Sequence, residues 1–156
     1  MFRIPRAAFG VLYEVARHLL RRPVVGIVAA ARTKDGRWLL IRRGDTGTWA
    51  FPGGTLEWGE QLKDTLLREL EEEAGVTHVR MGKVLGVFSR PDRDVRFHAV
   101  TVLVACEVDP PIKPQKNTVE IRDVRLFHLE DIPRPLAMGM DDFLDIAIKA
   151  EDTILE

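Results

Sequence analysis

The sequence predicts one layered domain of the α/β (α+β) class, and three observations lead to this prediction. Short apolar runs separated by turn residues recur between residues 24 and 129 and indicate strands. The stretches 60–74 and 139–151 are instead predicted to be helices, and strands mixed with a few helices form layered domains. The length of 156 residues is that of one domain, and 46% hydrophobic with 30% charged residues is an ordinary globular composition.

The first residues are predicted to form an amphipathic helix of their own, which divides the chain into a helical extension (1–22) and a main domain (23–156). Pro5 suits a first helical turn, and Pro23 stops the helix. Five arginines against the single Glu14 make this segment basic. Such a helix either lies on an anionic membrane surface or packs on its own domain or a second subunit, and we expect packing. Its apolar residues at helical spacing are Phe9, Leu12, Val15, Ala16, Leu19 and Leu20.

Turn signals divide the main domain into strands on either side of an acidic helix. The runs VVGIVAAAR (24–32) and RWLLIRRG (37–44) flank the turn TKDG and are expected to form a hairpin. TWAFPGG (48–54) contains a Pro-Gly turn and is interpreted as a strand end or loop. Gly75 is typical of the residue that ends a helix. Three further strands and the last helix follow, at 82–89, 95–108, 120–129 and 139–151.

The helix of residues 60–74 carries an unusual concentration of acid. At 100° per residue, Glu69, Glu72 and Glu73 project from one face, beside an apolar arc that would face the core. Like charges on adjacent turns repel, and a divalent cation among them would remove the repulsion, because carboxylate oxygens are the ligands that magnesium and manganese prefer. The alternative is a solvated helix face, with Arg68 and Lys63 offsetting the charge.

Nine positions around this helix follow the pattern G-x5-E-x7-R-E-U-x-E-E-x-G-U, where U is aliphatic. The matching residues are Gly54, Glu60, Arg68, Glu69, Leu70, Glu72, Glu73, Gly75 and Val76. The pattern resembles the Nudix box of the Nudix hydrolases at every specified position. The resemblance extends over residues 23–150 and implies an α/β/α sandwich with a mixed sheet.

The resemblance also implies a role for each polar residue of the box. A divalent cation, Mg²⁺ or in its place Mn²⁺, would be bound by Glu69, Glu72 and Glu73, with a carbonyl of Gly53 or Gly54 as an extra ligand and Glu60 nearby. Arg68 would orient the neighbouring glutamates. Two residues are candidates for the general base, Glu73 and Glu120. We favour Glu120, at the start of a strand, as base or further metal ligand; the alternative is a surface acid.

Nudix hydrolases cleave a pyrophosphate bond in a nucleoside diphosphate linked to a second group. The stretch FSRPDRDVRFHAVTVLV (88–104) resembles a motif of small ADP-ribose pyrophosphatases, which favours ADP-ribose or a nucleoside diphosphate sugar as substrate. The alternatives are a (d)NTP or dinucleoside polyphosphate hydrolase and a non-enzymatic ligand sensor. Candidate substrate contacts are Arg42, Trp49, Arg90, Arg93, Arg96 and His98, although the arginines also fit a solvated loop and the histidine a strand position.

The net charge, the apolar stretches and the cysteine count exclude several other classes of protein. A formal net charge of -1 points neither to nucleic acid nor to a membrane surface, so we expect no nucleic-acid partner. No apolar stretch approaches the ~20 residues of a membrane span. Cys106 is the only cysteine, which rules out an intrachain disulfide. We therefore expect a cytoplasmic protein with a small-molecule nucleotide substrate, and the family resemblance favours a homodimer.

Overall fold

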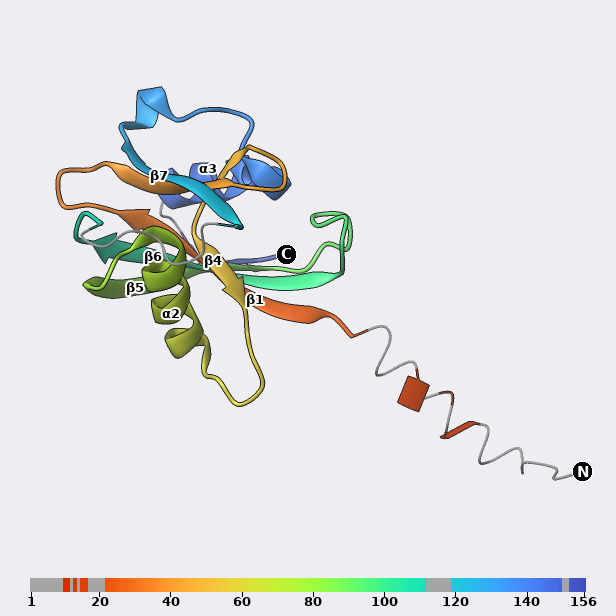
Figure 1. The fold of residues 1–156 in the computed structure, drawn as a ribbon. Helices are drawn as coiled ribbons and strands as arrows, with labels where there is room; N and C mark the ends of the chain where they lie inside the picture. Colours follow the sequence, from red (N-terminus) through yellow and green to blue (C-terminus); the bar gives the residue numbers. More distant parts are fainter. Residues whose placement is uncertain (1–9, 12, 14, 17–21, 112–118, 150–151) are drawn as a thin grey trace, which may run out of the picture.

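The structure, a computed structural model, describes residues 10–11, 13, 15–16, 22–111, 119–149 and 152–156 (Figure 1). Most of the expected N-terminal helix lies outside these residues, and the five described positions between residues 10 and 16 are helical. Within the described ranges, no helix is long and apolar enough to cross a membrane.

Eight strands form one mixed sheet, which confirms the predicted α/β (α+β) class. The hydrogen-bonded order is β3-β2-β1-β6-β5-β8, with β4 paired to β1 and β7 paired to β2. Two pairs, β1 with β6 and β5 with β8, are parallel, and the other pairs are antiparallel. The strands are β1 (Val24–Arg32), β2 (Trp38–Arg43), β3 (Trp49–Ala50), β4 (Gly53–Thr55), β5 (Val79–Phe88), β6 (Ala99–Val108), β7 (Ile121–Phe127) and β8 (Ile154–Leu155).

The centre of the sheet is β1, whose continuous apolar run is covered on both faces. Residues Ile27 to Ala31 are all at most 7% exposed, as expected for a strand with no solvent-facing side. Figure 1 shows α2 (Leu62–Ala74) and α3 (Asp141–Lys149) on opposite sides of the strands. The expected hairpin between β1 and β2 is paired only at Arg32 and Trp38, and β4 pairs with β1 further along. This divergence makes room for the glycines of β4 beside α2.

Helix α2 begins two residues later than expected and ends where expected. Its N-cap, Gln61, has an extended backbone and makes no side-chain capping bond. Glu60 lies outside the helix, and its carboxylate accepts hydrogen bonds from the Glu57 N–H and the Thr65 hydroxyl. At the other end Gly75 adopts the left-handed conformation (φ 68°) that favours glycine.

The C-terminal part of the chain differs most from expectation. A 3₁₀ turn (Ala137–Gly139) precedes α3, which ends at Lys149. Ile154 and Leu155 form β8, a two-residue strand that pairs with Gly86 and Val87 of β5. Two residues are too short for the alternation that identifies a strand in sequence, so β8 could be found only from the fold. A second 3₁₀ turn (Leu129–Asp131) follows β7.

Candidate active site

The site is built where β4 passes between β1 and α2. Gly53 pairs with Val28 and Gly54 with Ile27. A Cβ atom on Gly53 would collide with the Ile27 carbonyl and the Val28 backbone, whereas one on Gly54 would collide with the carboxylate of Glu69. Only glycines therefore allow the strand to approach both its neighbour and the helix so closely.

A cavity of about 600 Å³ opens over this junction, within the size range of ligand pockets. We call it the acidic hollow. Its charged walls come from β2, α2 and the segments before β6 and β7, so residues far apart in sequence meet there. The residues that characterise it are Glu69, Glu73, Glu120, Arg43, Gly53 and Gly54.

Glu73 is the most buried acid at the hollow, with 7% of the residue exposed. Its Oε2 accepts a hydrogen bond of 2.9 Å from the Gly53 N–H, which ties α2 to β4. Burial raises the pKa of Glu73 to about 8, and the nearby Glu69 and Glu120 charges act in the same direction. The bond from Gly53 and the charge of Arg43 oppose this rise only in part. A bound cation would relieve the cost of ionising this buried acid.

Glu69 lies one turn earlier in α2, with 14% of its side chain exposed. Burial raises its pKa, while the guanidinium of Arg68, 2.9 Å from Oε1, lowers it. The charges of Glu72 and Glu120 raise it further. Two half-buried or buried carboxylates that penalise each other's ionisation are thus held at one wall of the hollow.

The other two acids of the box, Glu60 and Glu72, form ion pairs with Arg68. The guanidinium of Arg68 forms two hydrogen bonds with Glu60, of 2.8 and 3.1 Å, and lies 3.5 Å from Glu72. The hydrogen bonds from Arg68, with those from Thr65 and the Glu57 backbone, lower the pKa of Glu60 to about 2. Neither Glu60 nor Glu72 lines the acidic hollow. Arg68 therefore contacts three glutamates of the box, Glu60, Glu69 and Glu72, and its orienting role stays a prediction.

The donor set fits a hard divalent cation in its chemistry. The hollow offers the carboxylates of Glu69 and Glu73 beside the backbone of Gly53 and Gly54, and oxygen donors of this kind suit magnesium and manganese. As the side chains lie, no three His, Cys, Asp or Glu residues of the described chain are arranged to hold a metal ion. When a cation is bound, Glu69 and Glu73 would hold it beside the backbone of Gly53 and Gly54.

Glu120 lines the hollow from the segment just before β7, whereas Glu69 and Glu73 line it from α2. It is exposed, and its carbonyl accepts a 2.5 Å hydrogen bond from the Gly44 N–H. Its charge contributes to the raised pKa values of both Glu69 and Glu73, which places the carboxylate within electrostatic reach of them. The bulge between β2 and β7 at Arg42 and Arg43 brings this strand end to the site.

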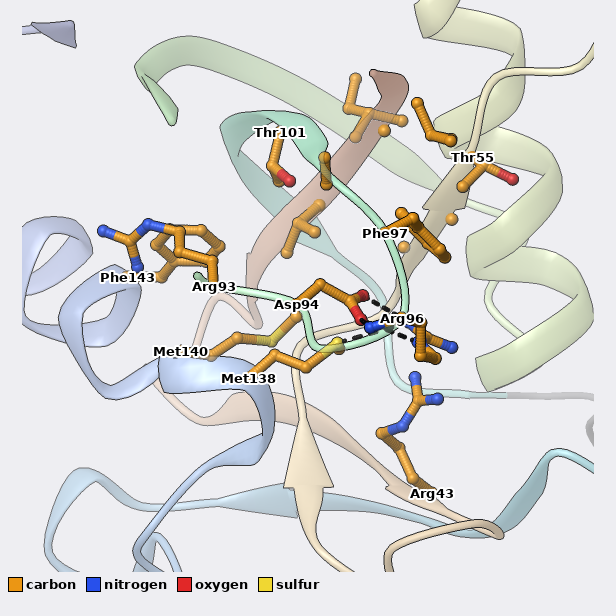
Figure 2. Close-up of a pocket in the computed structure, with 17 residues that line it drawn as sticks. Arg43, Thr55, Arg93, Asp94, Arg96, Phe97, Thr101, Met138, Met140 and Phe143 are labelled. Carbon is orange, nitrogen blue, oxygen red and sulfur yellow. Dashed lines mark hydrogen bonds and ion pairs between the residues drawn. The ribbon is translucent and has the colours of Figure 1, made fainter. Parts of the chain in front are cut away.

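A second cavity adjoins the hollow and differs from it in character. We call it the apolar pocket (Figure 2); its side walls include Phe97, Met138, Met140 and Phe143. The two cavities have six lining residues in common, so they adjoin each other, and we call the two together the groove. The shared residues are Arg43, Gly53, Gly54, Thr55, Arg96 and Phe97.

Of the six candidate substrate contacts, only Arg93 and Arg96 line this groove. Arg96 borders both cavities, and Arg93 borders the apolar pocket. Arg90 and His98 are exposed, and the His98 ring bonds to the Ser89 carbonyl at 2.7 Å. Trp49 packs edge-on against Phe127 with ring centroids 4.8 Å apart.

Arg43, and not the predicted Arg42, lines the site. The guanidinium of Arg42 donates to the Gly47 carbonyl at 3.0 Å on the exposed side of β2, whereas Arg43 lines both cavities. Alternation along a strand allowed only one of the two to face the site, and the sequence contains no signal for which one. Sequence reasoning also missed Phe97 and the two methionines, because their place in the groove depends on how α3 and the preceding turn pack against β1.

Comparison with known proteins agrees with this fold and site. The NUDIX domain family model matches residues 20–145, which is most of the chain. The protein therefore belongs to the Nudix hydrolase family, as the box predicted. The resemblance identified from nine positions is thus confirmed over nearly the whole described domain.

Particular relatives refine the picture. An ADP-ribose pyrophosphatase from Methanocaldococcus jannaschii is 33% identical over 104 residues, 65% of this chain and 60% of that protein. An uncharacterised Nudix hydrolase from Bacillus subtilis is 36% identical over 120 residues, 75% of each chain. The crystal structure of an ADP-ribose pyrophosphatase from Streptococcus suis superposes with a TM-score of 0.70 at 25% identity, covering 86% of this chain and all of that one. The chain thus spans less than two thirds of the archaeal relative.

Proposed function

We propose that the protein is a divalent-metal-dependent pyrophosphatase that hydrolyses ADP-ribose or a related nucleoside diphosphate sugar to a nucleoside monophosphate and a sugar phosphate. The observation that carries the proposal is the pair of adjoining cavities, one acidic and one apolar, which share six lining residues. A nucleoside diphosphate sugar has the same division, with a charged pyrophosphate between a base and a sugar. The two named ADP-ribose pyrophosphatases among the relatives support this substrate class.

The acidic end suits the pyrophosphate only if a cation is present, since bare carboxylates repel phosphate. A bound Mg²⁺ would neutralise charge on the phosphates and lower the pKa of a coordinated water. Glu69 and Glu73 are proposed to hold the cation, with Glu72 joining them from its 3.5 Å contact with Arg68. Arg68 is proposed to orient Glu69 and Glu72, which its guanidinium contacts at 2.9 and 3.5 Å.

We assign the general base to Glu120. Glu73 is buried and accepts the Gly53 N–H, so its carboxylate is committed to the wall of the hollow. Glu120 is exposed at the rim of the same hollow, where it can take a proton from water and return it to solvent. Arg43 and Arg96, which border both cavities, are suited by their fork-shaped guanidinium groups to phosphate oxygens at the boundary.

A single product assay tests the proposal. The protein is incubated with Mg²⁺ and separately with ADP-ribose, nucleoside diphosphate sugars, dinucleoside polyphosphates and (d)NTPs, and the products are separated by ion-exchange chromatography. AMP with ribose 5-phosphate is the expected result, abolished by EDTA. Release of pyrophosphate from (d)NTPs as the preferred reaction would instead make the protein a nucleotide-clearing hydrolase. Binding of ADP-ribose without turnover of any substrate would make it a sensor.

Two properties of the whole protein are also proposed. We propose a homodimer, because the exposed apolar side chains Val11, Tyr13 and Val15 would be covered by a partner subunit. We also propose a cytoplasmic location, where nucleotide substrates and magnesium are abundant. Sedimentation of the full chain against one lacking residues 1–22 tests the first proposal, and a monomer in both cases would contradict it.

A further inference from the structure

The segment between β5 and β6, residues 89–98, forms the wall where the two cavities meet. Arg93, Asp94, Arg96 and Phe97 of this segment line the apolar pocket, and the last two also line the acidic hollow. The segment contains turns and bends but no helix or strand. Its position in the groove must therefore be maintained by contacts outside its own backbone.

Those contacts come from the far end of the chain. Strand β8 pairs with β5, and the Glu156 N–H donates to the Val87 carbonyl at 3.0 Å. The Glu156 carboxylate then accepts the backbone N–H groups of Ser89 and Arg90, both at 3.0 Å. One carboxylate thus binds the first two residues of the segment directly.

The same carboxylate holds Arg93. The Arg93 guanidinium donates to Glu156 through Nη2 at 2.5 Å and through Nε at 3.1 Å. It also lies over the rings of Phe88 (5.1 Å) and Phe143 (5.3 Å), and only 11% of its side chain is exposed. Its other carboxylate contact is the more exposed Asp142, at 3.4 Å. Glu156 is therefore the stronger of the two contacts that keep Arg93 against these rings.

Next to Arg93 in the sequence is Asp94, which forms an ion pair with Arg96, a residue that lines the acidic hollow. The carboxylate of Asp94, 8% exposed, accepts two bonds from the Arg96 guanidinium, at 2.9 and 2.7 Å. Figure 2 shows Arg93 beside Phe143, Asp94 and Arg96 at the centre of the pocket, and Arg43 beyond them. The order Glu156, Arg93, Asp94, Arg96 is a continuous series of bonded or adjacent residues from β8 to the shared wall.

We propose that Glu156 is a positioning residue for substrate binding: it fixes segment 89–98 and thereby sets Arg96 and Phe97 in the wall common to the acidic hollow and the apolar pocket. The expected effect on KM rests on the proposed pyrophosphatase function. The expected effect on the order of segment 89–98 does not. Because Glu156 touches neither cavity, its loss affects the binding of substrate and leaves the metal-dependent chemistry of Glu69 and Glu73 in place.

The test compares Glu156→Gln with Arg93→Met and with the double variant. Glutamine retains an acceptor for the backbone N–H groups but loses the charge that binds Arg93. We expect KM for the preferred substrate to rise about fivefold or more in each single variant with kcat nearly unchanged, the signature of lost ground-state positioning. The effect of the double variant on KM should be smaller than the two single effects combined, because both substitutions remove the same bond between Arg93 and Glu156. Glu156→Asp should recover part of the loss.

Two further measurements separate this proposal from its competitors. Hydrogen exchange of residues 89–98 should be faster in Glu156→Gln even if the protein hydrolyses none of the substrates tried. The structural role of Glu156 can therefore be tested even if the proposed pyrophosphatase function is wrong. Glu107→Gln, which breaks an exposed ion pair with Arg80, is the matched control and should change neither exchange nor KM. Unchanged exchange in Glu156→Gln, or a fall in kcat with constant KM, would overturn the proposal.

Discussion

At the scale of single residues, the glutamates of α2 differ mainly in what surrounds them. Glu73 is buried against Gly53, Glu69 divides its contacts between Arg68 and the hollow, and Glu72 has 41% of its side chain exposed. Glu72 and Glu73 follow Glu69 by three and four residues, which places all three on one face, but the structure distinguishes an interior, an intermediate and an outer acid. The interior one should matter most to catalysis and cost most to keep ionised.

Replacing Glu73 with glutamine should abolish hydrolysis while leaving the fold intact. The amide keeps the size of the side chain and can still accept the Gly53 N–H, but it cannot supply a negative oxygen to a metal. Metal stabilisation of developing charge is worth several kcal/mol, so we expect kcat to fall at least about 100-fold. Steady-state kinetics and circular dichroism check this result. Glu71→Gln on the same helix, at a position that lines neither cavity, is the control and should retain near-normal rates.

Acid stability should depend on Glu156. Hydrogen bonds from Arg93 hold the pKa of Glu156 at about 2, below its ordinary value of 4.5; Arg90 and Asp142 also face this cluster. Because the folded-state pKa is depressed, the stabilisation is fully present above pH 4.5 and is lost as the pH falls toward about 2. Because Glu156 is partly exposed, its charge contributes only about 1 kcal/mol to the free energy of unfolding.

Urea unfolding at pH 7, 4.5 and 3 measures this contribution. Glu156→Gln should be less stable than the parent chain at pH 7, and the difference between the two should narrow at pH 3. A constant difference across the series would mean that the charge of Glu156 contributes nothing and that only its shape matters.

At the scale of elements, the close approach of β4 to β1 and α2 creates the site. Gly53 faces backbone and Gly54 faces the end of a side chain, so the same substitution at adjacent positions should have different results. Gly53→Ala forces a methyl group into the Ile27 carbonyl and should destabilise the fold by about 1–3 kcal/mol. Gly54→Ala needs only the Glu69 carboxylate to move, so it should cost activity more than stability.

Thermal unfolding and kinetics on both variants separate these effects. We expect a lowered Tm with proportionate activity of the folded fraction for Gly53→Ala, and a nearly normal Tm with greatly reduced kcat for Gly54→Ala. The reverse order would mean that Glu69 does not approach β4 in solution.

The same elements explain how far the sequence could predict the fold. Helix α2 and its end at Gly75 were predictable, because periodicity and a left-handed glycine are local properties. The meeting of Glu120 with α2 followed only from family resemblance, and the choice of Arg43 over Arg42 depended on a bulge that has no signature in sequence. Strand β8 and the contacts of Glu156 were not predictable, because they join residues more than 60 positions apart.

At the scale of the whole molecule, a cation at the acidic hollow should stabilise the entire fold. The hollow is lined by residues of α2, β2, β4 and the segment before β7, so a cation there would connect these elements and relieve the repulsion among Glu69, Glu73 and Glu120. A ligand that binds only the folded chain adds about 2.7 kcal/mol at a concentration 100 times its Kd. For a chain of this size that corresponds to a rise in Tm of about 5–10 °C.

Differential scanning calorimetry with increasing Mg²⁺, at constant ionic strength set with NaCl, measures this rise. The parent chain should show a saturable increase in Tm that Mn²⁺ reproduces. Glu73→Gln should start from a Tm at least as high, because it no longer buries an ionisable acid, and should gain nothing from either metal. Glu71→Gln should respond as the parent does. An equal rise in Glu73→Gln would place the cation elsewhere, and no rise in the parent chain would contradict a metal site in the folded protein.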